Sequence, residues 1–216
     1  MRKLMFVFAA LILVLVFVVG VVYDRSQKTE QAGMRAEQNQ SALVRPHSRV
    51  LGSATATVQI VEFLDPACET CRRFYPLVKQ LLATHPDRIN LVVRYAPFHQ
   101  NSTFVVALLE AAGRQGKYWE TLEALLAGQD GYVANHAVQP DLVWRSIEGI
   151  GLDISKIRAD MLDPAISKLI TQDLEDARAL NVTKTPEFFV NGKPLPSFGF
   201  EQLKRRVDEA LSNPQR

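Results

Sequence analysis

A run of twenty residues without a charge, 4–23, limits how the rest of the chain can be organised. Nineteen of these residues are apolar and the remaining one is Gly20. At about 1.5 Å of rise per residue, a helix of this length spans the roughly 30 Å hydrocarbon core of a bilayer. A cleaved signal peptide has a shorter apolar stretch, of about 7 to 15 residues, followed by small residues. Because this run ends in Val21, Val22 and Tyr23, we predict an uncleaved transmembrane signal-anchor, with a cleaved signal as the alternative.

The charges beside this run predict its orientation and exclude one class of partner. Arg2 and Lys3 are the only charges before Asp24, so the positive-inside rule places residues 24–216 across the membrane. We expect a single-pass protein of the inner (cytoplasmic) membrane with its C-terminal domain in the periplasm or another extracytoplasmic space, and a cleaved signal predicts the same location. Without those two residues, the 25 Lys and Arg become 23, against 23 Asp and Glu. With no basic cluster visible, no nucleic acid partner is expected.

Composition divides the chain into three segments. Residues 1–23 are the cytoplasmic tip and the signal-anchor. Residues 24–47 are polar, rich in Gln and too poor in apolar residues to bury a face, so we interpret them as a polar tether or a partly helical stalk. Residues 48–216 are expected to form the folded domain, and 49–52 is its entry.

The folded domain is expected to begin with two strands and a helix. Residues 58–64 are rich in β-branched and aromatic residues, which is typical of a buried strand. Apolar residues recur at helical spacing over 74–82, and Pro76 predicts a kink in that helix. Residues 89–95 are a second strand. Strand, helix and strand in this order suggest a parallel βαβ unit.

Helical patterns fill the middle of the domain. Four segments each carry an apolar face at helical spacing: 101–113, 117–127, 141–150 and 164–180. The chain then closes with a hairpin and an amphipathic helix, predicted over 188–190, 193–195 and 200–211 with a turn at Asn191-Gly192. The order predicts an α/β fold, in which a small sheet carries a helical insertion at about 100–180.

The two cysteines of the chain, Cys68 and Cys71, form C-E-T-C at the junction between the first strand and the first helix. The free N–H groups and the positive dipole end of a helix N-terminus favour a thiolate, and such cysteines have pKa values of about 3.5 to 7.5. We predict a redox site in which Cys68, nearer the exposed end, is the attacking nucleophile. Cys71, one turn deeper, is then the resolving cysteine.

Two other interpretations of the cysteine pair remain open. A structural disulfide would close a very short loop and would stabilise little by chain entropy. A Cu or Zn site would need two more ligands, and the histidines offer no second pair at ligand spacing: His47, His85, His99 and His136. Neither alternative explains why the cysteines stand where a strand meets a helix.

Three motifs resemble the DsbA-like branch of the thioredoxin superfamily. They are V-E-F-L-D-P-A-C-E-T-C, A-A-G-R-Q-G-K-Y-W in the helical block, and T-P-E-F-F-V-N-G-K-P-L. The similarity runs from about Arg49 to the C-terminus, and the segments before it lie outside the resemblance. It implies a thioredoxin-like fold with an inserted helical subdomain, here preceded by an N-terminal transmembrane helix.

The resemblance also implies roles for particular residues. Thr185 and Pro186 match the family's cis-proline element, which lies beside the cysteines and offers backbone groups to an extended substrate; the alternative is that Pro186 simply begins a strand. Glu62 matches the buried acid that moves protons to and from the resolving cysteine, and burial should raise its pKa. The alternative is a glutamate facing the sheet edge. Arg94 is a candidate to pair with Glu62.

The chain also departs from the family's pattern. Strongly oxidising members have a histidine just before the second cysteine, whereas this chain has Thr70 there and Glu69 beside it. A carboxylate next to Cys68 should raise its pKa relative to that pattern, which favours an isomerase or reductase. Trp119 and Trp144 are interpreted as aromatics that pack between helices.

Together these features predict a thiol–disulfide oxidoreductase that acts on cysteine-containing proteins through a mixed disulfide. No cofactor is expected, because the dithiol itself carries the two electrons. A membrane redox partner would recharge the cysteine pair. The alternatives are a non-enzymatic domain that binds Cu or Zn through the same thiolates, and a substrate-binding or chaperone module that works without redox chemistry.

Overall fold

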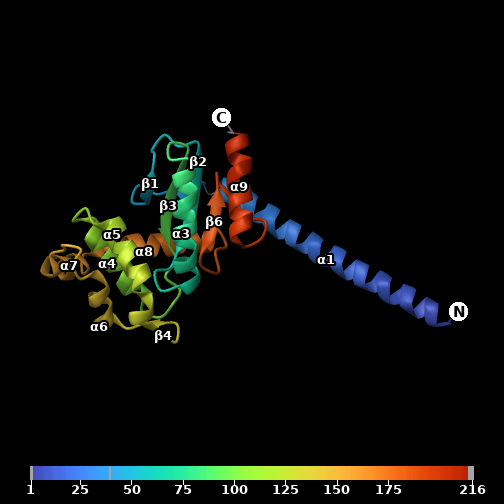
Figure 1. Cartoon of the computed structure of the whole chain (residues 1–216), viewed down its shortest axis with the longest axis horizontal. Helices are drawn as coiled ribbons and strands as arrows, with labels where there is room; N and C mark the ends of the chain where they lie inside the picture. The colour runs from blue at the N-terminus through green and yellow to red at the C-terminus, as the bar shows by residue number, and fades with distance from the viewer. Residues whose placement is uncertain (1, 39, 214–216) are drawn as a thin grey trace.

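The computed structural model describes the backbone of residues 2–38 and 40–213 and the side chains of residues 12–34 and 40–213. The chain begins with α1 (Arg2–Gln38), one long helix that projects away from the rest of the molecule (Figure 1). Within the residues whose side chains are described, no helix is long and apolar enough to cross a membrane. The predicted transmembrane helix is therefore not confirmed. The described apolar part, 12–23, is only about 18 Å long before Asp24, and 4–11 lie outside the described side chains.

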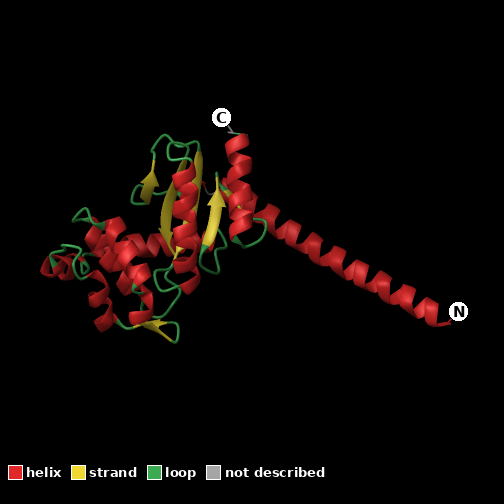
Figure 2. Cartoon of the chain, in the orientation of Figure 1, coloured by secondary structure: helices red, strands yellow, loops and turns green. Residues whose placement is uncertain are grey.

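A five-stranded sheet forms the centre of the domain (Figure 2). Its strands run in the order β1 (Arg49–Gly52), β3 (Ile89–Tyr95), β2 (Val58–Leu64), β6 (Glu187–Val190) and β7 (Lys193–Pro194). Only β2 and β3 are parallel, as the βαβ prediction requires, while the other neighbours are antiparallel. The predicted strands 58–64 and 89–95 are confirmed. The edge strand β1 was expected only as the entry to the domain, because four residues are too short a pattern to predict a strand.

Helices cover both faces of the sheet (Figure 1). On one face lie α3 (Glu69–Thr84), which contains Pro76, and α9 (Phe200–Ser212). On the other face lie α8 (Pro164–Ala179) and the short α2 (Gln40–Leu43). Each face buries its own set of apolar residues, since side chains alternate along a strand. The CxxC is on the α3 face.

A helical block lies between β3 and α8 in the chain. It consists of α4 (Ser102–Gly113), α5 (Tyr118–Ala127), η1 (Gln129–Gly131), the small hairpin β4 (Val133–Ala134) and β5 (Ala137–Val138), α6 (Pro140–Val143), η2 (Trp144–Ile147) and α7 (Ile154–Asp160). The predicted helix 141–150 is only two short turns, because Gly149 and Gly151 take positive φ values of 81° and 83°. The sequence reasoning missed α7, whose first turn is capped by Asp153.

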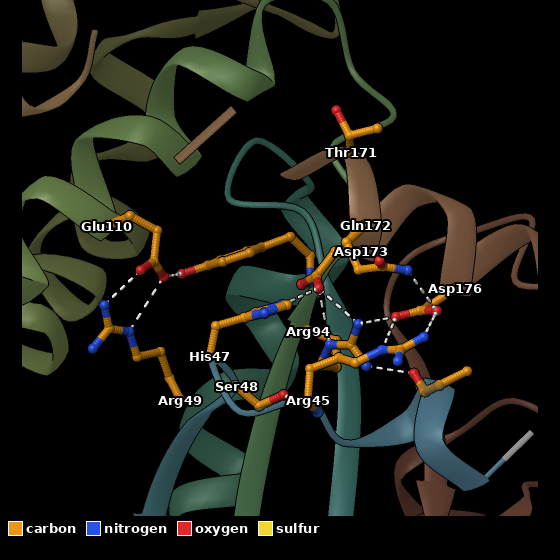
Figure 3. A network of polar contacts seen from close by, with 12 residues as sticks. Arg45, His47, Ser48, Arg49, Arg94, Glu110, Thr171, Gln172, Asp173 and Asp176 are labelled. Carbon is orange, nitrogen blue, oxygen red and sulfur yellow. Dashed lines mark hydrogen bonds and ion pairs between the residues drawn. The ribbon is translucent and has the colours of Figure 1, made fainter. Parts of the chain in front are cut away.

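The end of the predicted tether is packed onto the domain (Figure 3). Ala42 and Leu43 are buried against the α8 face of the sheet. Arg45 binds Asp176 of α8 through two hydrogen bonds, and His47 lies 2.7 Å from a carboxylate oxygen of Asp173 on the same helix. The segment 40–47 is therefore held by a network of polar contacts and is not a free linker, although its sequence is polar.

Candidate active site

The two cysteines lie where the central strand β2 gives way to α3. Cys68 has an extended backbone and precedes the first residue of the helix, and Cys71 lies in the first turn. Both are free thiols; Cys68 is 6% exposed and Cys71 is completely buried. The first cysteine is thus the one that a macromolecule can reach, and the second faces the protein interior.

Hydrogen bonds around Cys68 favour its thiolate. They lower the pKa of Cys68 to about 5, the largest contribution coming from the Cys71 side chain. The Thr185 side chain and the backbone N–H groups of Cys71 and Thr70 lower the pKa further, while partial burial acts in the opposite direction. Most of Cys68 is therefore ionised at neutral pH.

A segment far along the chain completes the surroundings of Cys68. In its thiol form the Sγ of Cys68 donates a hydrogen bond to the carbonyl oxygen of Thr185 at 3.2 Å, across 117 residues of sequence. The peptide bond between Thr185 and Pro186 is cis. Both residues precede β6, which pairs with β2, so the sheet brings them to the cysteine.

Glu62 lies beneath the cysteine pair as a buried carboxyl group with no hydrogen-bond partner among the described residues. Burial, followed by the nearby Cys68, raises the pKa of Glu62 to about 8. Burial and the hydrogen bond to Cys68 raise the pKa of Cys71, and the charge of Glu62 adds to this effect. Glu62 and Cys71 are therefore two protonated groups that influence each other inside the protein.

Arg94 does not pair with Glu62, contrary to our expectation. In the register of the parallel pair, Arg94 stands beside Phe63, one residue after Glu62. Because side chains alternate along a strand, Arg94 points to the opposite face of the sheet. There it is completely buried and pairs with Asp173 and Asp176 at 2.6 Å each (Figure 3).

Glu69 does not act on Cys68 as the sequence suggested. Its side chain is 64% exposed and extends toward Arg73, 3.6 Å away. Glu69 is absent from the main influences on the pKa of Cys68, which is lowered and not raised. The lowered pKa of Cys68 lies within the range predicted for a cysteine at a helix N-terminus, whereas the expected contribution of Glu69 is not among its main influences.

Asp65, completely buried just after β2, is a residue whose importance was missed. Its carboxylate accepts hydrogen bonds from the N–H of Ala67 at 2.9 Å, the N–H of His99 at 2.9 Å and the Ser102 hydroxyl. The ring Nδ1 of His99 lies 2.7 Å from the same carboxylate. These bonds lower the pKa of Asp65 despite its burial, and Asp65 raises the pKa of His99. The position of Asp65, directly after a strand that the sequence predicts to be buried, was the pattern that could have identified it.

The helical block also holds the loop that carries Cys68. Gln129 donates through Nε2 to the carbonyl oxygens of Pro66 at 2.8 Å and Cys68 at 3.1 Å. The hydroxyl of Tyr132 donates to Pro66 at 3.2 Å. No sequence pattern pointed to Gln129 or Tyr132, because their partners are backbone oxygens of a distant loop.

The other candidates lie apart from the cysteines. Trp144 packs edge-on against Phe104 of α4, so it packs between helices as interpreted, whereas Trp119 packs edge-on against its neighbour Tyr118 in the same helix; both lie against the hydrophobic core. In the part of the chain whose side chains are described, no group of three or more His, Cys, Asp or Glu residues is placed to hold a metal ion.

Comparison with known proteins places this geometry in a family. A family model described as thioredoxin matches residues 45–209, three quarters of the chain. The chain belongs to the thioredoxin family. A thioredoxin-like oxidoreductase from Silicibacter pomeroyi DSS-3 is 32% identical and superimposes with a TM-score of 0.70, over 81% of this chain and 98% of that one. The family and this relative support oxidoreductase activity as the coarse function.

More distant structures share the fold. The thiol–disulfide exchange protein α-DsbA2 from Wolbachia pipientis has a TM-score of 0.71 at 20% identity, over 85% of this chain and 97% of that chain. BdbD from Bacillus subtilis has a TM-score of 0.67 at 20% identity, over 77% and 94%. Together with the family model and the Silicibacter pomeroyi structure, these structures confirm the resemblance seen in the sequence.

Longer proteins match as well. The Na⁺/H⁺ antiporter NhaA 3 of Salinispora tropica is 33% identical over 173 residues, which are 78% of this chain and 25% of the antiporter. The chain thus spans about a quarter of the length of the curated relatives it matches. No transport activity is assigned to it on this basis.

Proposed function

We propose that the chain exchanges disulfides with protein substrates through Cys68 and Cys71. In the oxidised protein the two cysteines share a disulfide, and a substrate thiolate attacks the sulfur of Cys68. The mixed disulfide forms while Cys71 departs with the electron pair of the old bond. A second substrate thiolate then attacks the substrate sulfur and releases Cys68 as a thiolate. Two electrons pass from the substrate to the protein, and the reverse sequence reduces a substrate disulfide.

The acidity of Cys68 is the observation that carries this proposal. A thiol with a pKa of about 5 is a good leaving group, which speeds release of the substrate disulfide. A stabilised thiolate also stabilises the reduced protein, so we expect a reduction potential toward the oxidising end of the family, above about −230 mV. Glu69 and Thr70 favoured an isomerase or reductase, and a measured reduction potential decides between the two directions.

Two neighbours of the cysteines have supporting roles in the proposal. Glu62 gives a proton to Cys71 when that sulfur departs and takes it back when Cys71 attacks, since both groups are buried and have raised pKa values. Thr185 and Pro186 bind an extended substrate segment beside Cys68. The Thr185 carbonyl supports this, because it already accepts a bond from Cys68.

The proposal also includes where the protein acts and which kind of protein exchanges electrons with it. We infer an extracytoplasmic domain that receives its oxidising or reducing equivalents from a membrane redox protein. The residues 4–23 would hold the chain in the inner membrane, with Arg2 and Lys3 on the cytoplasmic side. A cell fractionation experiment with a C-terminal reporter tests this part, and a reporter found only in the cytoplasm would contradict it.

Thiol trapping of the full chain in glutathione buffers tests the chemistry. We expect one reversible intramolecular disulfide, no exchange activity in Cys68→Ser, and a trapped mixed disulfide with a model substrate in Cys71→Ser. The last variant is the matched control, because it keeps the nucleophile and removes only the resolving step. If Cys68 and Cys71 form no reversible disulfide, the proposal fails.

A further inference from the structure

An open groove of about 760 Å³ lies in the helical block, away from the cysteine pair. Its walls come from α4, η2, α7 and α8, and Phe104, Met161, Ile166 and Leu174 are among its lining residues. The volume is within the range of about 300–1,000 Å³ that is typical of small-molecule sites. Neither the thioredoxin fold nor the proposed exchange reaction requires such a groove.

The groove exposes apolar surface. Leu162 at its rim is 84% exposed, the highest exposure of any large apolar side chain in the described residues. Phe104 and Met161 are only partly buried although they pack against the core. Exposed apolar surface of this kind, when it lines a concavity, marks a binding site for an apolar group.

One cation faces this apolar surface. Among the described residues that line the groove Arg158 is the only charged one, and its guanidinium lies over the ring of Trp144, 4.0 Å from the centroid. Among the described residues no carboxylate lies within ion-pair distance of Arg158. Three acids lie within five residues of Arg158 in the sequence, and each has another partner: Asp160 pairs with Arg114 and Lys156, Asp163 pairs with Arg114, and Asp153 accepts the backbone N–H of Lys156. Arg158 therefore keeps its donors available to a ligand.

We propose that this groove binds a single-chain amphipathic carboxylate, such as a medium- or long-chain fatty acid. The alkyl chain lies along Phe104, Ile166 and Leu174, and the carboxylate accepts hydrogen bonds from Arg158. Apolar walls with a single unpaired guanidinium at one wall fit this chemistry. A neutral lipid would leave Arg158 unpaired, and a dianion would lack a second cation.

Fluorescence of Trp144 provides a direct readout, because this residue lines the groove. The test uses the full chain in phosphatidylcholine nanodiscs, with Trp119→Phe to leave one tryptophan, and titrates decanoate and 1-decanol, which have the same alkyl chain. We expect saturable quenching by decanoate. Arg158→Gln should weaken decanoate binding about tenfold and change 1-decanol binding less than about twofold, since only the charged head contacts the guanidinium.

Two further variants separate the proposal from simpler explanations. Arg145→Gln removes a charge of the same type beside Trp144 but outside the groove, and should leave both affinities unchanged. Leu162→Ser, on an exposed residue, should weaken both ligands without affecting the fold. Absence of saturable quenching, equal losses for the acid and the alcohol in Arg158→Gln, or equal effects of Arg145→Gln would overturn the proposal. The cysteine pair takes no part in this test, so its outcome is independent of the exchange reaction.

Discussion

Glu62 and Arg94 lie on neighbouring strands of one sheet, and both are completely buried. Arg94 has three ionic hydrogen bonds, to Asp173 and Asp176, and a fourth to the carbonyl oxygen of Ala42. Neither carboxyl oxygen of Glu62 has a partner among the described residues. The two faces of the sheet therefore use buried polar groups differently. The fully paired charge of Arg94 holds segments of the chain together, whereas the unpaired acid Glu62 has a raised pKa that suits it to proton transfer.

Removal of the paired charge should have the largest effect on stability. Arg94→Met removes the fully buried cation beside Asp173 and Asp176 and leaves Arg45 and His47, both partly exposed, as their ion-pair partners, so we expect a loss of about 3–5 kcal/mol in the free energy of unfolding. Urea denaturation measures it. The matched control is Arg206→Met, which breaks an exposed pair with Glu209 and should cost at most about 1 kcal/mol. Equal losses in the two variants would contradict the distinction between the faces.

Replacement of the unpaired acid, Glu62, should increase stability at neutral pH, whereas replacement of Arg94 should decrease it. Folded Glu62 keeps its proton up to about pH 8, whereas an ordinary glutamate loses it near pH 4.5. The unfolded chain therefore binds fewer protons in this window, and stability falls as pH rises through it. At pH 7 this cost is on the order of 3 kcal/mol. Denaturation of reduced wild type and Glu62→Gln between pH 5 and 8 should show a flatter profile for the variant; parallel profiles would place Glu62 in a polar environment.

His99 combines features of both residues: like Arg94 it pairs with a carboxylate, that of Asp65, and like Glu62 it has a pKa that the charge of Cys68 raises. Loss of its positive charge in His99→Gln should raise the pKa of Cys68, by less than about one unit, since His99 is not among the main influences on that thiol. Alkylation rates against pH measure the shift. His85→Gln, at the far end of α3, should leave the midpoint unchanged. An unchanged midpoint in His99→Gln would make Asp65 and His99 purely structural.

Sequence patterns predicted the parts of the molecule that depend on neighbours along the chain. The strands 58–64 and 89–95 and the hairpin at Asn191-Gly192 have continuous local signals, and all three are present. The position of Cys68 at the start of a helix follows in the same way. The partners of Arg94 were not predictable, since Asp173 lies 79 residues away and strand alternation alone does not show which helix covers the face.

In the candidate site too, local motifs were predictable and contacts between distant residues were not. Cys68, Cys71 and Pro186 stand in recognisable motifs, but the groups that set the acidity of Cys68 include backbone N–H groups and the side chain of the distant Thr185, and no sequence pattern pairs these with the cysteine. The direction of Glu69 was likewise decided by Arg73 one turn along the helix. Charges near a cysteine in the sequence are therefore a weak guide to its reactivity.

The bond between Cys68 and Thr185 also has a consequence for how the protein is made. Synthesis proceeds from the N-terminus, so Cys68 leaves the ribosome more than a hundred residues before Thr185 does. Until β6 joins the sheet, the Thr185 side chain, one of the groups that lower the pKa of Cys68, is not in place, and the thiol is less acidic than in the folded protein. We therefore expect the full acidity of Cys68 only once the fold is complete.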